Sequence, residues 1–126
     1  MYTVEINNKQ GNVFEVKAKE NSFIIEPLTD RLSPGEVLLA SLGSCMGFFA
    51  RRYLESSKIS SAGFSLKLTA DFTKDQPMRF KEITVSFDLG QAGLDPSRKE
   101  AFIRFIENCP IHNTLKGNPG IKVELR

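Results

Sequence analysis

The chain has 126 residues, of which 40% are hydrophobic and 25% charged, as is typical of one globular domain with its own core. A net charge of +2, with acidic and basic residues mixed along the chain, argues against a nucleic-acid-binding protein. The longest apolar run, residues 37–50, is shorter than the about 20 residues that span a membrane. No basic and apolar leader opens the sequence, so we expect a cytoplasmic protein with no membrane partner.

The first part of the sequence predicts three short strands. Residues 2–6 and 13–16 alternate between apolar and polar side chains around a turn at residues 9–12, which is typical of a β-hairpin. Residues 23–25 form a third apolar segment, and Pro27 ends it. We therefore expect a small antiparallel sheet at the start of the chain.

A long helix is predicted next, from the Ser33-Pro34 pair to about Ser56. Ser33 is a suitable N-cap, and Pro34 fits the first helical position. Glu36 can reach back to the cap residue and complete a capping box. The start of this helix is the best-defined boundary in the sequence.

The same helix is apolar on nearly every side until Arg51, and such a helix has to be covered all round. One sheet covers one side only, so we expect a second subunit on the other. Gly43 and Gly47 stand one turn apart, where they would let a second helix approach closely. The pattern therefore favours an obligate homodimer.

The remainder predicts two strands, a helix and a last strand. Residues 64–70 and 83–89 alternate as strands do, and an Asp-Pro start indicates a helix over residues 95–108. Residues 121–125 alternate again and predict the final strand. The order βββ-α-ββ-α-β, with hairpin-linked strands, indicates an α+β fold with a single domain over residues 1–126.

Cys45 and Cys109 are the candidate functional residues, because thiols are the only good nucleophiles in this sequence. Helical spacing aligns Cys45 with Phe49, and Cys109 with Phe105, so each thiol faces the interior from its own helix. They could meet as an attacking and a resolving pair, and in a reducing cytosol a transient disulfide is more plausible than a structural one. The alternative is that both are small buried hydrophobic residues.

Other chemistry has weaker support in the sequence. Cys45, Cys109 and His112 could supply three metal ligands, but one His and no second cysteine pair make this a weak signal, and we expect no metal. A Cys–His hydrolase would need an oxyanion hole, which no motif indicates. A reactive Cys45 needs a nearby cation or hydrogen-bond donor, and the sequence offers four candidates: Arg31, Arg52, Arg79 and His112.

Three segments of the chain resemble the OsmC/Ohr family, the osmotically inducible and organic hydroperoxide resistance proteins. They are the helix start through the first cysteine (residues 33–45), the central hairpin (residues 76–85) and the second cysteine region (residues 107–117). They occur in the order found in the family and extend over nearly the whole chain. The paired cysteine segments, rather than either cysteine alone, make the resemblance specific.

The resemblance implies an OsmC-like fold, in which two chains form an intertwined homodimer with paired central helices. It also implies a thiol-dependent peroxidase of oxidative-stress defence. Cys45 would attack the O–O bond of a hydroperoxide, Cys109 would close a disulfide, and an external dithiol would restore both thiols. No cofactor is implied, because sulfur carries the electrons. Apolar surroundings suit organic hydroperoxides better than hydrogen peroxide.

The chain departs from the family around the thiol. Family members support the reactive thiolate with an Arg from the N-terminal strands, but residues 1–30 contain no Arg. Their Glu follows the helix-start Pro directly, whereas Glu36 stands one position later and points away from Cys45 on an ideal helix. We keep Arg31, Glu36 and His112 as supporting residues. The departures favour a second hypothesis, a non-catalytic dimer that binds a small apolar ligand or partner.

Overall fold

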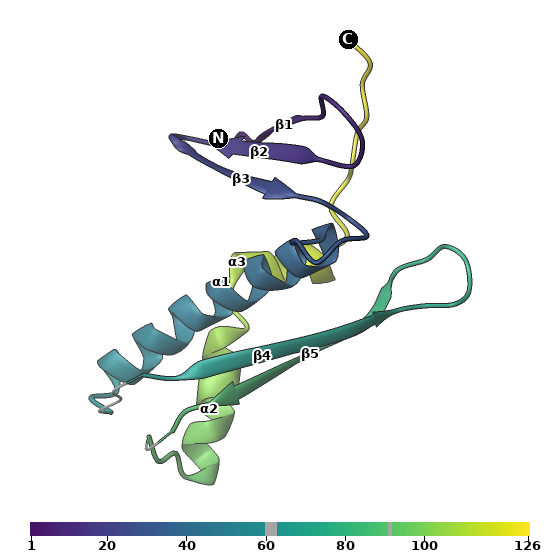
Figure 1. Cartoon of the computed structure of the whole chain (residues 1–126). Helices are drawn as coiled ribbons and strands as arrows, with labels where there is room; N and C mark the ends of the chain where they lie inside the picture. The colour runs from purple at the N-terminus through teal and green to yellow at the C-terminus, as the bar shows by residue number, and fades with distance from the viewer. Residues whose placement is uncertain (60–62, 91) are drawn as a thin grey trace. The chain divides into compact units, whose positions relative to one another are not determined.

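The computed structural model describes residues 1–59, 63–90 and 92–126. The strands form two antiparallel sheets and the helices are separate from them, so the predicted α+β class is confirmed (Figure 1). The chain divides into two compact units, Met1–Leu39 and Ala40–Arg126. The elements, in chain order, are β1 (Glu5–Asn7), β2 (Phe14–Ala18), β3 (Asn21–Ile25), α1 (Pro34–Ser56), β4 (Ser65–Phe72), β5 (Phe80–Asp88), α2 (Pro96–Ile106) and α3 (Pro110–Lys116).

The N-terminal unit contains the three predicted short strands, in the order β1-β2-β3. Val16 is its buried residue, and it lies opposite Ile6 on one side and Phe23 on the other. The turn between β1 and β2 places Gly11 at a φ of 52°, which favours glycine. The Asn8 side chain closes this turn by donating hydrogen bonds to the carbonyl oxygens of Gly11 and Val13, at 2.9 and 3.0 Å.

The predicted start of α1 is confirmed in detail. The Ser33 N–H donates to Glu36 Oε1 at 2.9 Å, and the Glu36 N–H donates to Ser33 Oγ at 3.3 Å. These two bonds are the reciprocal pair of a capping box. The backbone N–H of Ser33 also lowers the pKa of the Glu36 carboxyl, because it stabilises the charged form.

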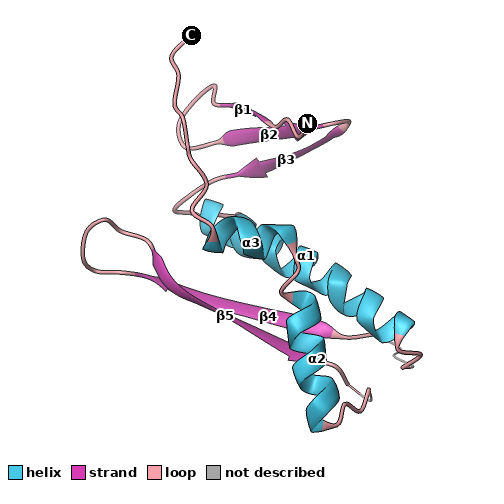
Figure 2. Cartoon of the chain, turned by 180° about the vertical axis from the view of Figure 1, so that it is seen from behind, coloured by secondary structure: helices cyan, strands magenta, loops and turns pink. Residues whose placement is uncertain are grey.

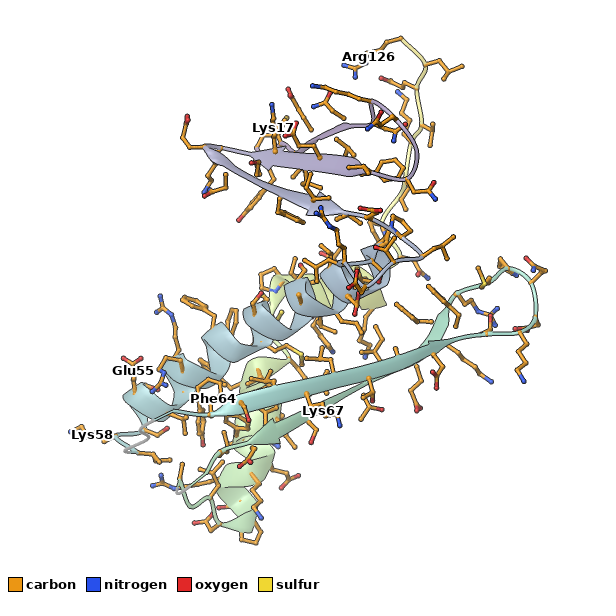
Figure 3. The ribbon with its side chains drawn as sticks, viewed as in Figure 1. Lys17, Glu55, Lys58, Phe64, Lys67 and Arg126 are labelled. Carbon is orange, nitrogen blue, oxygen red and sulfur yellow. The ribbon has the colours of Figure 1, made fainter. Side chains whose placement is uncertain are left out.

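The second unit contains the main hydrophobic core. In the β4–β5 ribbon, Leu66 lies opposite Phe87 and Leu68 opposite Val85, and these side chains pack against the helices. Both views show α2 beside one end of this ribbon (Figures 1 and 2). Lys67 points to the outer face of the ribbon (Figure 3). The buried residues of the core are Leu42, Met46, Ala50, Phe102, Ile106 and Cys109.

The two glycines of α1 face the ribbon of the same chain, so the prediction that they admit a second helix is wrong. A Cβ on Gly43 would lie 2.7 Å from Leu68 Cδ1, and a Cβ on Gly47 would lie 3.6 Å from Leu66 Cδ1. The small residues therefore let α1 pack closely on β4. The helical spacing correctly indicated a close approach at the two glycines, but the element that approaches them is β4 of the same chain.

The C-terminal part differs most from the sequence prediction. The second helix ends at Ile106, and the additional helix α3 follows immediately. Residues 121–125, expected as a strand, form none. An isolated strand has no backbone partners, and here the apolar side chains of Ile121, Val123 and Leu125 are exposed. No helix in the described ranges is both long and apolar enough to cross a membrane.

Candidate thiol site

Cys45 lies in the middle of α1 and is partly buried against the core of the second unit. Its neighbours on the same helix face include Leu42, which is buried, and Phe49, which packs against the core. Cys45 is therefore set in apolar surroundings, and part of the residue remains exposed.

Cys109 has no exposed surface and lies between α2 and α3. Its N–H donates to the Ile106 carbonyl oxygen at 3.1 Å, and its own carbonyl oxygen accepts from the Asn113 N–H at 3.0 Å. Its Sγ caps α3 by accepting from the His112 N–H at 3.4 Å. The thiol is thus held in place by backbone contacts on both sides.

The two side chains lie close enough to interact, because Cys45 packs against the core cluster that contains Cys109 and affects the pKa of Cys109, and both remain free thiols. Burial raises the pKa of Cys109 above its ordinary value of 9.0, and the contact with Cys45 raises it further. The backbone N–H groups of His112 and Ile111 act in the opposite direction but do not outweigh burial. These influences together make the Cys109 thiol harder to ionise than an ordinary cysteine.

An aromatic ladder continues from the thiols along the contact between α1 and α2. The Phe49 and Phe105 ring centroids are 5.9 Å apart. Tyr53 follows at 5.7 Å from Phe105 and 5.5 Å from Phe102. Aromatic pairs at such separations are favourable beyond the area they bury. The ladder fixes the spacing of the two helices and so helps to hold the two sulfurs in contact.

His112 contacts Cys109 through its backbone, whereas its ring is directed to neighbouring residues. Nδ1 lies 3.2 Å from Asn113 Oδ1, and Nε2 lies 4.0 Å from Glu107 Oε2. The contribution of His112 to the site is therefore the N–H that holds the Cys109 sulfur. The ring can serve to connect the end of α2 to α3.

The other candidate supporting residues are engaged close to their own positions in the sequence. Arg31 Nε lies 3.8 Å from Glu26 Oε1, and Glu36 closes the capping box with Ser33. Arg79 Nη1 lies 3.5 Å from an Asp75 carboxylate oxygen. Each of these charges has a local structural contact.

The metal hypothesis receives no support from the described ranges. They contain no group of three or more His, Cys, Asp or Glu side chains that could hold an ion. Cys45 and Cys109 approach each other, but the His112 ring faces Asn113 and Glu107 instead.

Sequence reasoning missed the role of Cys109 as a helix cap. Pro110 follows Cys109 directly, and this cap-then-proline order also begins α1 and α2. The signal was therefore present, although Cys is an uncommon cap. The aromatic partners of the site could not be assigned in advance, because periodicity gives the face of a helix but not its neighbour.

A protein-family comparison matches residues 28–124 to the family described as OsmC-like protein. The chain belongs to this family. The matched residues include both cysteines, the capping box and the β4–β5 ribbon. A comparison with curated protein sequences gives no match.

Solved structures show the same fold at low sequence identity. An OsmC-like protein from Mycoplasma pneumoniae is 17% identical with a TM-score of 0.82, over 93% of this chain and 88% of that one. An organic hydroperoxide resistance protein OsmC from Legionella pneumophila is 17% identical with a TM-score of 0.67, over 94% and 90%. The organic hydroperoxide resistance protein OhrB of Bacillus subtilis is 14% identical with a TM-score of 0.70, over 99% and 98%.

Proposed function

We propose that this OsmC-like chain is a thiol-dependent peroxidase that reduces organic hydroperoxides through Cys45 and Cys109. The observation that carries the proposal is the contact between a partly exposed thiol and a fully buried one on separate helices. Two structural neighbours named as organic hydroperoxide resistance proteins support the choice of substrate.

The first step belongs to Cys45, because it is the partly exposed residue of the pair whereas Cys109 is fully buried. The Cys45 thiolate attacks one oxygen of the hydroperoxide and breaks the O–O bond. Sulfur is oxidised to a sulfenic acid, and the leaving alkoxide takes a proton and departs as an alcohol. The apolar surroundings of Cys45 favour a substrate with an apolar tail.

The second step belongs to Cys109. Its sulfur displaces the hydroxyl of the Cys45 sulfenic acid, a disulfide forms and water leaves. Both sulfurs belong to the same chain, so this reaction is intramolecular, which removes the entropic cost of bringing two separate molecules together. An external dithiol then reduces the disulfide and is itself oxidised, which returns both thiols to the starting state.

The proposal includes a homodimer in a reducing compartment, the cytoplasm. The C-terminal segment exposes Ile121, Val123 and Leu125, and the N-terminal sheet exposes Ile6 and Phe23. Apolar surface of this kind is commonly covered by a partner. A reducing compartment would also supply the dithiol that the cycle needs.

The test is the consumption of cumene hydroperoxide by the reduced protein in the presence of dithiothreitol. The wild type should consume it catalytically, and Cys45→Ser should reduce the rate to that of the reductant alone. Ser44→Ala is the matched control, since Ser44 is the exposed neighbour of Cys45 on the same helix. Equal rates for the wild type and Cys45→Ser would refute the proposal.

A second candidate function is the binding of an apolar ligand without catalysis. A cavity of about 580 Å³ between β5 and α2 favours it, and its walls include Phe87, Phe102 and Ile103. If the thiols do not react with hydroperoxide, the binding of apolar molecules to this cavity is the function to test. Phe102→Ala should then change their affinity, because Phe102 lines the cavity.

A further inference from the structure

The end of α2 and the start of α3 are joined by polar side chains that the proposed chemistry does not use. Glu107 is the C-cap residue of α2, and Cys109 is the N-cap residue of α3 two positions later. The His112 side chain on α3 is largely covered, whereas Glu107 is exposed. We call Glu107, His112 and Asn113 the clamp.

Both nitrogens of the His112 ring face oxygen atoms. Nδ1 lies 3.2 Å from Asn113 Oδ1, and Nε2 lies 4.0 Å from Glu107 Oε2. The orientation of the Asn113 amide is set at its other atom, because Nδ2 donates to the Asn108 carbonyl oxygen at 3.5 Å. A neutral imidazole donates from one nitrogen, whereas an imidazolium donates from both. The two oxygens therefore fit the protonated ring, which forms an ion pair with Glu107.

The position of Glu107 is unfavourable for α2 itself. The carbonyl end of a helix carries a partial negative charge, which repels a carboxylate placed there. Arg104, the basic residue of the last turn, has Nη1 3.8 Å from Glu100 Oε1 and so pairs with the preceding turn. Glu107 therefore gains its favourable contact from outside α2, and the contact that the structure shows is the one with the His112 ring.

The residue whose ring the clamp holds also supplies the backbone donor to the Cys109 sulfur. The His112 N–H donates to Cys109 Sγ at 3.4 Å. This bond lowers the pKa of Cys109, although burial raises it more. A contact that keeps His112 in place therefore also keeps in place the donor that favours the Cys109 thiolate.

We propose that Glu107 is a positioning residue for the closing of the disulfide. Through the His112 ring it holds the start of α3 at the end of α2, and it thereby keeps the His112 N–H on the Cys109 sulfur. The inference rests on the proposed peroxidase function for the step that it affects. The clamp itself can be tested without that function.

The affected step is the attack of the Cys109 thiolate on the Cys45 sulfenic acid. An S–S bond forms, the S–O bond breaks, and the hydroxide takes a proton and leaves as water. Glu107→Gln keeps the shape of the side chain and removes the ion pair. Below the pKa of Cys109, the thiolate fraction should fall about threefold, the low end of what one hydrogen bond contributes.

The closing rate should fall less, by about twofold, because a more basic thiolate is also a stronger nucleophile. Stopped-flow measurement after one equivalent of cumene hydroperoxide should resolve the oxidation of Cys45 from the closing of the disulfide. In Glu107→Gln the first phase should keep its rate and the second should become slower. A second phase as fast as that of the wild type would overturn the inference.

Glu100→Gln is the matched control, because Glu100 is an exposed acid on α2 that pairs with Arg104. It removes the same charge and should change neither phase. His112→Gln removes the ring but keeps the backbone N–H, and it should slow the second phase as Glu107→Gln does. The double variant should be no slower than His112→Gln alone, since the two side chains act as one unit. Additive losses would overturn the clamp.

A separate readout needs no hydroperoxide: the titration of Cys109 in Cys45→Ser, followed by the carbon NMR shift of its Cβ. Cys109 is then the only cysteine. Cys45→Ser removes the ionisable neighbour that α1 presents to it, and leaves Glu107 and His112 at the ends of α2 and α3. The clamp predicts that adding Glu107→Gln moves the titration midpoint of Cys109 to higher pH, whereas adding Glu100→Gln leaves it unchanged.

The charge of Glu107 acting alone predicts the opposite direction, because a nearby carboxylate disfavours the thiolate and its removal would lower the midpoint. An equal or lower midpoint in Glu107→Gln would therefore overturn the inference, even if the wild type reduces hydroperoxides. A higher midpoint would support the clamp even if the wild type leaves cumene hydroperoxide unreduced, a result that refutes the proposed function alone.

Discussion

Cys45 and Cys109 are chemically the same side chain, and the fold makes them different. Cys45 is partly exposed within a helix, whereas Cys109 is fully buried and its sulfur accepts a backbone N–H. Burial and the contact with Cys45 raise the pKa of Cys109. This asymmetry is the physical basis for assigning the first step to Cys45 and the second to Cys109.

Cys109→Ser should therefore stop the cycle after one turnover. Cys45 would still be oxidised by one equivalent of hydroperoxide, but no sulfur would be present to displace the hydroxyl of its sulfenic acid. Trapping with dimedone and mass spectrometry should detect the sulfenic acid on Cys45 in this variant. Cys109→Ser turning over with dithiothreitol as fast as the wild type would contradict the assigned roles.

The closing of the disulfide should become faster as pH rises. Thiolate is the reactive form of Cys109, and its pKa lies above the ordinary 9.0, so below that pH the thiolate fraction increases about tenfold per pH unit. Stopped-flow measurement after a single equivalent of hydroperoxide, from pH 6 to about pH 8.5, should show this slope. A closing rate independent of pH over this range would mean that Cys109 is already ionised.

At the scale of elements, helix starts were the most predictable features. Ser33-Pro34 and Asp95-Pro96 predicted α1 and α2, and each cap forms as expected. Local chemistry determines such boundaries, because the cap residue bonds to backbone within three positions of itself. The neighbours of an element are decided by the rest of the fold, which is why Gly43 was assigned to the wrong partner.

Gly43→Ala and Gly47→Ala form a matched pair that tests the packing of α1 on β4. Alanine at position 47 meets Leu66 at 3.6 Å, an ordinary contact, so the free energy of unfolding should rise by about 0.5–1 kcal/mol. Alanine at position 43 would place its Cβ 2.7 Å from Leu68 Cδ1. This overpacking should lower the free energy of unfolding by about 1 kcal/mol. Urea unfolding measures both. A stabilising Gly43→Ala would mean that Leu68 moves aside without cost.

At the scale of the whole molecule, the sequence predicted the α+β class, seven of the elements approximately and the inward orientation of the two cysteines. The sequence did not predict α3, and it predicted a strand over residues 121–125, where the structure has none. Alternation identifies a segment that could be a strand, but a strand forms only where another strand supplies hydrogen bonds. The single domain and the homodimer remain predictions.

The C-terminal segment offers a test of the homodimer. In an extended segment, Val123 and Lys122 point to opposite sides, so a partner that covers the apolar side would contact Val123 only. Val123→Asp should lower the dimer fraction in light scattering after size exclusion, and Lys122→Asp should leave it unchanged. The same dimer fraction in both variants would exclude this segment from the interface.

The most direct test of the central claim is the intact mass and the free-thiol count of the reduced protein after one equivalent of cumene hydroperoxide. A disulfide between Cys45 and Cys109 would appear as the loss of two hydrogens and of both thiols, reversed by a dithiol, and no such loss should occur in Cys45→Ser or Cys109→Ser. An unchanged mass with both thiols still free would contradict it, because two sulfurs in contact would then be inert toward the proposed substrate.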